Sequence, residues 1–316
     1  RMEEHAFVKK HSVQFITKDG RISAPFYFFQ HLDHPAATTW QVERSVFDEM
    51  LLRNAEEKGV EVREETQVQN FTFDGDCVTG VVARAKDGAD YSLQAPVTLD
   101  CTGREALFLR KKKWRRRDPQ LNKIAIWTLF KGAKRDPGLD EGATTVAYIP
   151  DKGWFWYIPL PDDIVSVGVV AEADYLYSGT RDPESIFARE ADNCLWISDH
   201  LSTGTRTEPV RVTGEFSYRS KNIGGEGFCL AGDAFAFLDP VFSTGIFMAL
   251  KSGEMAADAV DAGLNRGVID VDTFADYGRD LRWALDQFRE LVLSFYNQTF
   301  SFRDFIQAHP DLHPQL

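Results

Sequence analysis

The segment from 225 to 253, GEGFCLAGDAFAFLDPVFSTGIFMALKSG, constrains the fold more than any other part of the chain. A short apolar run from Phe228 to Ala231 predicts a buried strand, and Gly232 and Asp233 follow it directly. Open α/β sheets bind ligands at the carboxyl ends of their strands, and a glycine at such an end lets the backbone approach a ligand closely. The pattern therefore predicts an α/β fold with a ligand site at this strand end.

The turn Ser243-Thr244-Gly245 opens a run of residues with helical spacing. We expect a helix from about Thr244 to Gly263. The N–H groups at a helix N-terminus form a natural anion site. The turn is therefore predicted to hold a flavin ribityl-phosphate, a halide, or both.

Composition narrows the protein class without identifying the chemistry. The chain has 316 residues, of which 43% are hydrophobic and 27% charged, as in ordinary globular proteins, and two domains are expected. A formal net charge of −12 argues against a general nucleic-acid binder. The four cysteines are scattered, so we expect a reducing, cytoplasmic location and no zinc site. The histidines show no metal-like or triad-like spacing, and no apolar run is long enough for a membrane span.

Periodicity along the chain predicts a mixed order of strands and helices. We expect a β-hairpin over 6–30 that turns at Asp19-Gly20, and a helix over 44–58 that ends at Gly59. Strands are expected at 60–62, 66–73, 77–85, 91–93, 97–100, 124–130, 144–149, 154–160, 165–170 and 211–218. Helices are expected over 183–202 and in the aromatic-rich tail, 272–307.

This order predicts an α/β ligand-binding domain interrupted by a second domain. Residues 1–40 and 105–220 are assigned to an antiparallel-sheet substrate domain. Residues 41–104 and 221–262 are assigned to the ligand-binding domain, and 263–316 to a C-terminal helical segment. Ligand sites often lie at such domain junctions.

One strongly basic run, RKKKWRRR at 110–117, has two interpretations. It is either a solvated loop or helix face, or an electrostatic docking patch for an acidic partner such as a carrier protein. The sequence leaves both open.

Four segments together resemble the two-domain FAD monooxygenase superfamily. They are Val42-Glu43-Arg44 with Phe47-Asp48, Gly59-Val60-Glu61-Val62, Asp100-Cys101-Thr102-Gly103-Arg104, and Gly232-Asp233-Ala234 with Asp239-Pro240. Within that superfamily, F-x-x-P-x-x-S-x-G at 237–245 and W-x-W-x-I-P at 154–159 resemble the signatures of flavin-dependent halogenases. The resemblance implies that the ligand-binding domain is a Rossmann-like FAD domain.

In the family, reduced flavin and oxygen convert halide to hypohalous acid, which travels along a tunnel to a lysine and then halogenates an aromatic ring. The resemblance makes Lys10, five residues before Phe15, the candidate for that lysine, although Lys9 and Lys10 are also typical of a charged strand end. Trp154 and Trp156 resemble the tunnel tryptophans, and their alternation places both rings on one face of a strand. An ordinary aromatic core would show the same alternation.

The resemblance also implies the cofactor contacts and the partners. The expected flavin-binding residues are Gln41, Arg44, Val68, Gly232, Asp233, Pro240 and Gly245, and the expected halide-binding residues are Ser243, Thr244 and Gly245. A separate flavin reductase would supply the reduced FAD, and the small aromatic substrate is free or tethered to a carrier protein.

The chain departs from the family pattern at two places. Tryptophan halogenases carry a glutamate immediately before the Ser-Thr of this turn, whereas this chain has Phe242. We therefore expect a phenol- or pyrrole-type substrate in contact with Phe242 rather than tryptophan. The family's GxGxxG unit for the FAD pyrophosphate is absent from the sequence, as if the fold were truncated at its N-terminus, and we expect this chain to bind FAD weakly or not at all.

Two alternatives remain beside halogenation. A flavin monooxygenase or a geranylgeranyl-reductase-like enzyme of the same superfamily would carry most of the same motifs. A non-catalytic, truncated remnant that acts as a binding module is the third hypothesis.

Overall fold

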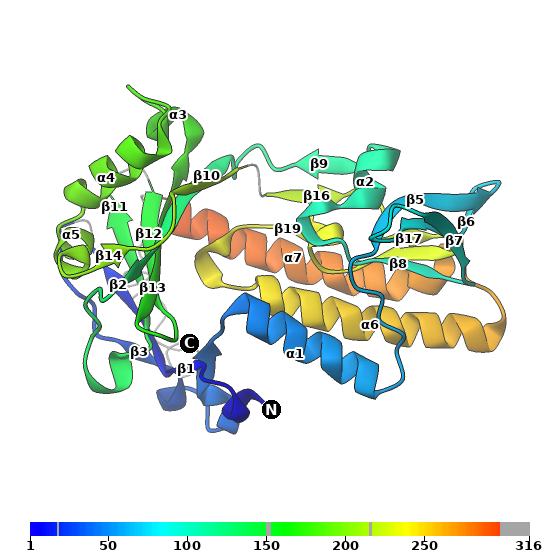
Figure 1. Cartoon of the computed structure of the whole chain (residues 1–316), viewed down its shortest axis with the longest axis horizontal. Helices are drawn as coiled ribbons and strands as arrows, with labels where there is room; N and C mark the ends of the chain where they lie inside the picture. Colours follow the sequence, from blue (N-terminus) through cyan, green and yellow to red (C-terminus); the bar gives the residue numbers. More distant parts are fainter. Residues whose placement is uncertain (18, 150–152, 215–216, 298–316) are drawn as a thin grey trace. The chain divides into compact units, whose positions relative to one another are not determined.

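The computed structural model describes residues 1–17, 19–149, 153–214 and 217–297, and its chain separates into two compact units (Figure 1). Unit 1 contains the described residues of Arg1–Val60 and Lys123–Gly214, together with Tyr296 and Asn297. Unit 2 contains Glu61–Asn122 and Glu215–Phe295. Residues 41–60 were grouped with 61–104 from the sequence, whereas their contacts place them in unit 1. The flavin and substrate roles of the domains remain predictions.

Unit 1 is built on an eight-stranded sheet with the order β14-β10-β13-β12-β11-β2-β3, to which β15 adds by pairing with β10. Its strands are β2 (Ser12–Ile16), β3 (Phe26–Tyr27), β10 (Lys123–Lys131), β11 (Thr144–Ile149), β12 (Gly153–Pro159), β13 (Ile164–Glu172), β14 (Thr205–Arg206) and β15 (Arg211–Gly214). Every pairing is antiparallel except β2 with β11. The four long strands predicted over 124–170 are thereby confirmed.

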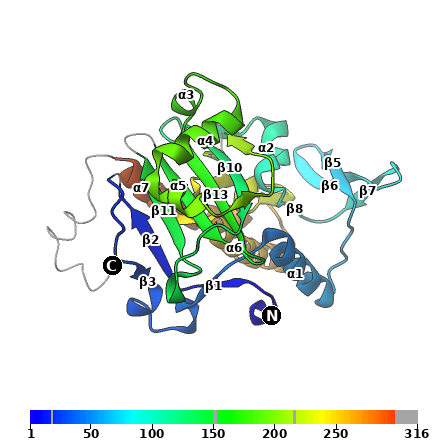
Figure 2. The same cartoon turned by 60° about the vertical axis from the view of Figure 1, so that its left-hand side comes forward.

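Helices cover one face of this sheet, as Figure 2 shows. They are α3 (Ala173–Leu176), α4 (Pro183–Asn193) and α5 (Leu195–Leu201). Alternate residues of β13, among them Val165, Val167 and Val169, are fully buried against Ile186 and Ile197 of these helices. The apolar side chains at every second position of β13 thus pack with the apolar faces of the helices in one core. The helix predicted over 183–202 is interrupted at Cys194, which has an extended backbone.

The N-terminal region differs from the predicted hairpin. The turn at Asp19-Gly20 is present, and β2 pairs with β3. Lys10, however, lies on a separate strand, β1 (Val8–Lys10), which pairs with β4 (Thr39–Gln41). The hairpin predicted over 6–30 is therefore wrong for residues 8–10, because residues 39–41 provide their partner strand. Helix α1 (Arg44–Glu57) follows β4 and ends before Gly59, as predicted.

The described residues of unit 2 form three small sheets and two long helices. The sheets are β5 (Gln67–Asp74), β6 (Cys77–Arg84) and β7 (Asp90–Gln94); β17 (Gly224–Gly225), β18 (Phe228–Leu230) and β8 (Thr98–Asp100); and β19 (Ala236–Phe237), β16 (Tyr218–Ser220) and β9 (Arg115–Arg117). The helices of this unit are α2 (Leu107–Lys112), α6 (Gly245–Arg266) and α7 (Ala275–Tyr296). The core joins the sheets to the long helices through Phe108, Phe228, Met248, Phe274 and Leu281.

Most of the predicted elements of unit 2 are confirmed. The strands predicted at 66–73 and 77–85 are joined by a turn at Gly75-Asp76, and β8, β18 and α6 occupy the predicted places. The strand predicted at 60–62 is wrong, since these residues form no strand and Val60 is 54% exposed. The helix predicted at 272–307 is confirmed as far as Tyr296, and Phe300, Phe302 and Phe305 lie outside the described residues.

Candidate active site

The predicted strand-end site of unit 2 rests on two parallel strands. Leu230 of β18 lies opposite Asp100 of β8, so both strands end at the same edge. Asp100 is buried, and its carboxylate accepts hydrogen bonds from the backbone N–H of Thr102 (2.9 Å) and of Phe108 (2.8 Å). Its backbone carbonyl accepts from Ala231 N–H at 3.1 Å. Asp100 thus anchors the loop edge from which Gly232 emerges.

Gly232 has a structural as well as a predicted binding role. Its φ of +56° is in the left-handed region that glycine adopts at little cost. Its N–H donates to the buried Ser252 hydroxyl of α6 at 2.7 Å, and an added Cβ would lie 3.3 Å from the Ala249 Cβ. Asp233 follows half-buried, and its carbonyl accepts from the Tyr218 hydroxyl at 2.7 Å. Sequence reasoning missed Ser252, because one serine among the small residues of a helix carries no distinctive signal.

The predicted anion turn connects a short 3-10 helix, Pro240–Phe242, to α6. The buried Asp239 carboxylate accepts from Val241 N–H at 3.0 Å, and Ser243 adopts a left-handed φ of +54°. Thr244 is the N-cap of α6 but gives no side-chain cap, and the first turn of the helix contains no acidic residue. The helix N-terminus therefore presents N–H groups that no side chain caps, which suits an anion.

Lys10 in unit 1 has the electrostatic character expected of a functional amine. Its side chain is half-buried, and its Nζ lies 5.7 Å from the centre of the Phe28 ring. Within the described residues, Lys10 makes no side-chain hydrogen bond or ion pair. Burial without a counter-ion disfavours the charged form and lowers the pKa of Lys10 to about 8. Such a pKa lies close to working pH, as is typical of catalytic groups.

A buried amide holds the strand pair that carries Lys10. Gln41 of β4 donates from Nε2 to the carbonyl of Gly142 (3.1 Å) and to the hydroxyl of Thr144 (2.7 Å). Gly142 packs so closely on β1 that an added Cβ would lie 1.9 Å from the Lys9 carbonyl oxygen. Both N–H bonds of the Gln41 amide are thereby used by the turn before β11 and by the first residue of β11. The flavin contact expected for Gln41 stays a prediction, while its contacts support a positioning role.

The two tryptophans share one face of β12 as predicted, with ring centroids 6.1 Å apart. Trp154 is buried, and its indole N–H donates to the Tyr296 hydroxyl at 2.8 Å. Trp156 is half-buried and donates to the Ser166 hydroxyl at 3.1 Å. Gly168 of β13 leaves room for the Trp156 ring, because an added Cβ would lie 2.3 Å from a ring carbon. The rings form a wall in unit 1, and their tunnel role remains a prediction.

The other predicted contacts are divided between the units. Arg44 at the start of α1 in unit 1 forms a two-point ion pair with Asp48 (both 2.9 Å). Val68 lies on β5 in unit 2 beside a register irregularity in its pairing with β6. Phe242, also in unit 2, packs edge-on against Phe295 with centroids 5.9 Å apart. Lys10, Gln41, Trp154 and Trp156 thus lie in unit 1, and Gly232 and the anion turn lie in unit 2.

The described residues contain no group of three or more His, Cys, Asp or Glu side chains arranged to hold a metal ion. None of their helices is long and apolar enough to cross a membrane.

Comparison with known proteins identifies the family. Residues 2–304 match the tryptophan halogenase family. The chain belongs to this family of flavin-dependent halogenases. It is 33% identical over 272 residues to tryptophan 2-halogenase of Chondromyces crocatus, covering 82% of this chain and 50% of that protein. It is 32% identical over 267 residues to a 1H-pyrrole-2-carbonyl-[peptidyl-carrier protein] brominase of Pseudoalteromonas luteoviolacea, covering 84% of this chain and 64% of that protein.

The fold agrees with the family. The solved structure of the myxobacterial chondrochloren halogenase, described as FAD-dependent, superposes with a TM-score of 0.86 at 30% identity. The match covers 95% of this chain and 70% of that structure. The predicted α/β fold with an antiparallel sheet, a Rossmann-like component and C-terminal helices is confirmed. The chain spans between half and two thirds of the length of the two curated relatives.

Proposed function

We propose that this protein is a flavin-dependent halogenase that uses reduced FAD, oxygen and a halide to halogenate an electron-rich aromatic ring, with Lys10 as the catalytic residue. The observation that carries the proposal is the half-buried Lys10 amine, whose pKa is lowered to about 8 by burial. It occurs in a chain that belongs to a halogenase family. Membership of a halogenase family and the lowered pKa of Lys10 both support halogenation through this lysine.

The residues of unit 2 fit a flavin and a halide. The absence of a side chain at Gly232 allows close approach to the carboxyl end of β18, and the N-terminus of α6 behind Thr244 attracts negative charge. When bound, reduced FAD would supply the two electrons that, with oxygen, convert halide to hypohalous acid. We assign Gly232, Asp233, Pro240 and Gly245 to the flavin and the backbone of 243–245 to the halide.

Lys10 would act on hypohalous acid as a hydrogen-bond donor. The ammonium group donates to the oxygen, polarises the oxygen–halogen bond and leaves the halogen electron-poor. The aromatic carbon forms a bond to the halogen as the oxygen–halogen bond breaks, and the departing hydroxide takes the Lys10 proton and leaves as water. The ring carbon then loses its proton to the neutral Lys10 amine, which restores the ammonium group. A lysine with a pKa of about 8 remains largely protonated at neutral pH and is poised to share its proton.

The substrate is proposed to be a phenol or pyrrole rather than tryptophan. Phe242 stands where the tryptophan halogenases carry glutamate, and it packs against the aromatic ring of Phe295. One relative is named for tryptophan and another for a carrier-bound pyrrole, so their names favour neither substrate. A carrier-tethered aromatic, a separate flavin reductase and a cytoplasmic location complete the proposal.

The assay measures the mass of a phenol and of a carrier-bound pyrrole after incubation with the protein, FAD, a flavin reductase, NADH, oxygen and bromide or chloride. We expect a halide-dependent mass increase corresponding to replacement of hydrogen by halogen. Gain of one oxygen without halogen would favour the monooxygenase alternative, and loss of a double bond in an isoprenoid would favour the reductase. Absence of product and of flavin binding would favour the non-catalytic remnant.

A further inference from the structure

Unit 2 contains a cavity of about 290 Å³ at which arginines from three elements converge. Arg116 and Arg117 belong to β9, Arg219 to β16 and Arg289 to α7. Ala236, Leu238 and Leu285 add apolar surface to the same lining, and Asp118 and Asp286 add two carboxylates. The volume lies near the lower end for small-molecule sites, which are roughly 300–1,000 Å³. The cavity therefore suits a small anion or the charged end of a modest ligand.

The central arginines face each other in an unfavourable arrangement. In the antiparallel pairing of β9 with β16, Arg116 lies directly opposite Arg219. Residues in this relation project from the same face of the sheet, and like charges placed there are destabilising. An anion held between the two guanidinium groups would relieve that repulsion.

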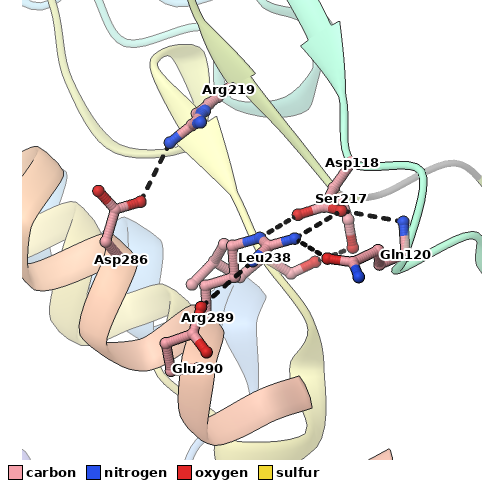
Figure 3. Close-up of polar contacts among 8 residues, drawn as sticks. All are labelled: Asp118, Gln120, Ser217, Arg219, Leu238, Asp286, Arg289 and Glu290. Atoms are coloured by element: carbon pink, nitrogen blue, oxygen red, sulfur yellow. Dashed lines mark hydrogen bonds and ion pairs between the residues drawn. The ribbon is translucent and has the colours of Figure 1, made fainter.

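The neighbouring carboxylates are paired with two of the cavity's arginines, Arg219 and Arg289, but not with Arg116 (Figure 3). Arg219 is paired with Asp286 at 3.0 Å, and Arg289 forms a two-point contact with Asp118 and also reaches Gln120. In the part of the chain that the structure describes, the side chain of Arg116 has no hydrogen bond or ion pair. Positive charge at the cavity is thus only partly compensated.

The residues of the basic run at 110–117 have different surroundings in the structure. Arg110, Lys111 and Lys112 lie in the last turn of α2. The Arg115 guanidinium lies 3.8 Å from the centre of the Tyr218 ring. Only Arg116 and Arg117 line the cavity. The run is therefore neither a uniform solvated face nor a uniform docking patch.

We propose that this cavity binds a phosphate group, carried by a small organic molecule, between Arg116 and Arg219. A phosphate offers more acceptor oxygens than a carboxylate and matches the planar donors of converging arginines. The apolar side chains of Leu238 and Leu285 provide a surface for the organic part of the ligand. The proposal requires neither flavin nor halide.

The test uses inorganic phosphate as the probe and chemical denaturation as the readout, at constant pH and ionic strength. Wild type is compared with Arg116→Thr, which keeps strand propensity, and with Arg279→Ala. Arg279 is an exposed, ion-paired residue of α7 outside the cavity. Succinate replaces phosphate in a second arm, to distinguish a phosphate from a carboxylate ligand.

We expect phosphate to stabilise wild type and Arg279→Ala in a saturable manner, as a ligand of the folded state does. In Arg116→Thr the apparent Kd for phosphate should rise by about tenfold, because a charged donor is lost. Without phosphate, Arg116→Thr should be at least as stable as wild type, since the repulsion with Arg219 is removed.

Three results would overturn the proposal. They are equal stabilisation of all three proteins by phosphate, equal stabilisation of wild type by succinate, and a marked loss of stability of Arg116→Thr in phosphate-free buffer. The samples contain no flavin and no aromatic substrate. Failure of this proposal therefore leaves the proposed halogenase function untouched, and the reverse also holds.

Discussion

Lys10→Met is expected to lower the rate of halogen incorporation by about 10²–10⁴-fold while the protein continues to support flavin oxidation. The substitution removes the donor that polarises hypohalous acid and keeps a side chain of similar length. Within the described residues, the half-buried Lys10 amine has no hydrogen-bond or ion-pair partner. No bonded neighbour can therefore donate to hypohalous acid in its place. Halogenated product is measured by mass spectrometry, and NADH and oxygen consumption are followed in parallel.

The same variant should be more stable than wild type at neutral pH. The pKa of Lys10 is lowered from 10.5 to about 8 in the folded protein, so the folded state pays for holding the charge below pH 8. Removing that charge should raise the free energy of unfolding by about 1–3 kcal/mol. The gain should be fully present below pH 8 and disappear as pH rises towards 10.5. Denaturant titrations at several pH values measure it.

The pH profile gives a second measure of the Lys10 role. If the protonated amine is the donor, kcat/KM for halogenation should fall as pH rises through about 8. A profile that instead rises through this pH would indicate that the neutral amine reacts, as in haloamine formation.

Lys9→Met is the matched control for Lys10→Met. Lys9 is adjacent on β1 but exposed, so its removal should leave halogenation within about twofold of wild type and stability within about 0.5 kcal/mol. Equal loss of activity in both variants would contradict the assignment of catalysis to Lys10. So would full activity of Lys10→Met.

Gly142→Ala is expected to reduce halogenation by more than about tenfold through displacement of the strand that carries Lys10. The new Cβ would lie 1.9 Å from the Lys9 carbonyl oxygen and 2.8 Å from Val8 Cγ1. Because the contact is with backbone, β1 must move, and a misplacement of about 1 Å can cost roughly a hundredfold in rate. Stability should fall by about 1–3 kcal/mol, as in overpacked cores.

Two measurements separate displacement of Lys10 from general unfolding. The titration of a ¹³C-methylated Lys10 amine, followed by NMR, should shift from about 8 towards the ordinary lysine pKa as the amine gains solvent. Glu141→Ala changes the neighbouring exposed residue and should alter neither activity nor this titration. An active Gly142→Ala protein with an unchanged Lys10 titration would show that β1 tolerates the added methyl group.

Elements with a local signal were predictable from the sequence. The alternating valines of β13, the helical spacing of α1 and the Asp19-Gly20 turn each report a periodicity or a turn geometry. Errors arose for strands, because a strand forms only with a partner strand that the local sequence does not specify. Val60–Val62 has strand-forming residues but forms no strand, and Lys10 joins β4 instead of the nearby hairpin.

The candidate site divides in the same way. Sequence motifs identified Gly232, the turn at Ser243 and the Trp154–Trp156 wall, because each motif is contiguous. Ser252, which accepts the Gly232 N–H, could not be found, since its role depends on the contact of α6 with the end of β18. The use of the Gln41 amide by Gly142 and Thr144 likewise joins residues about a hundred positions apart.

The sequence by itself determined the family resemblance, the order of most elements and the presence of a helix start in the strand-end segment from 225 to 253. These follow from local composition, spacing and backbone preference. Only the tertiary structure decided that Lys10 is a half-buried amine with a lowered pKa, and that Arg116 faces Arg219 across two strands. Desolvation and charge repulsion depend on distances in space, which residues far apart in the chain establish only when it folds.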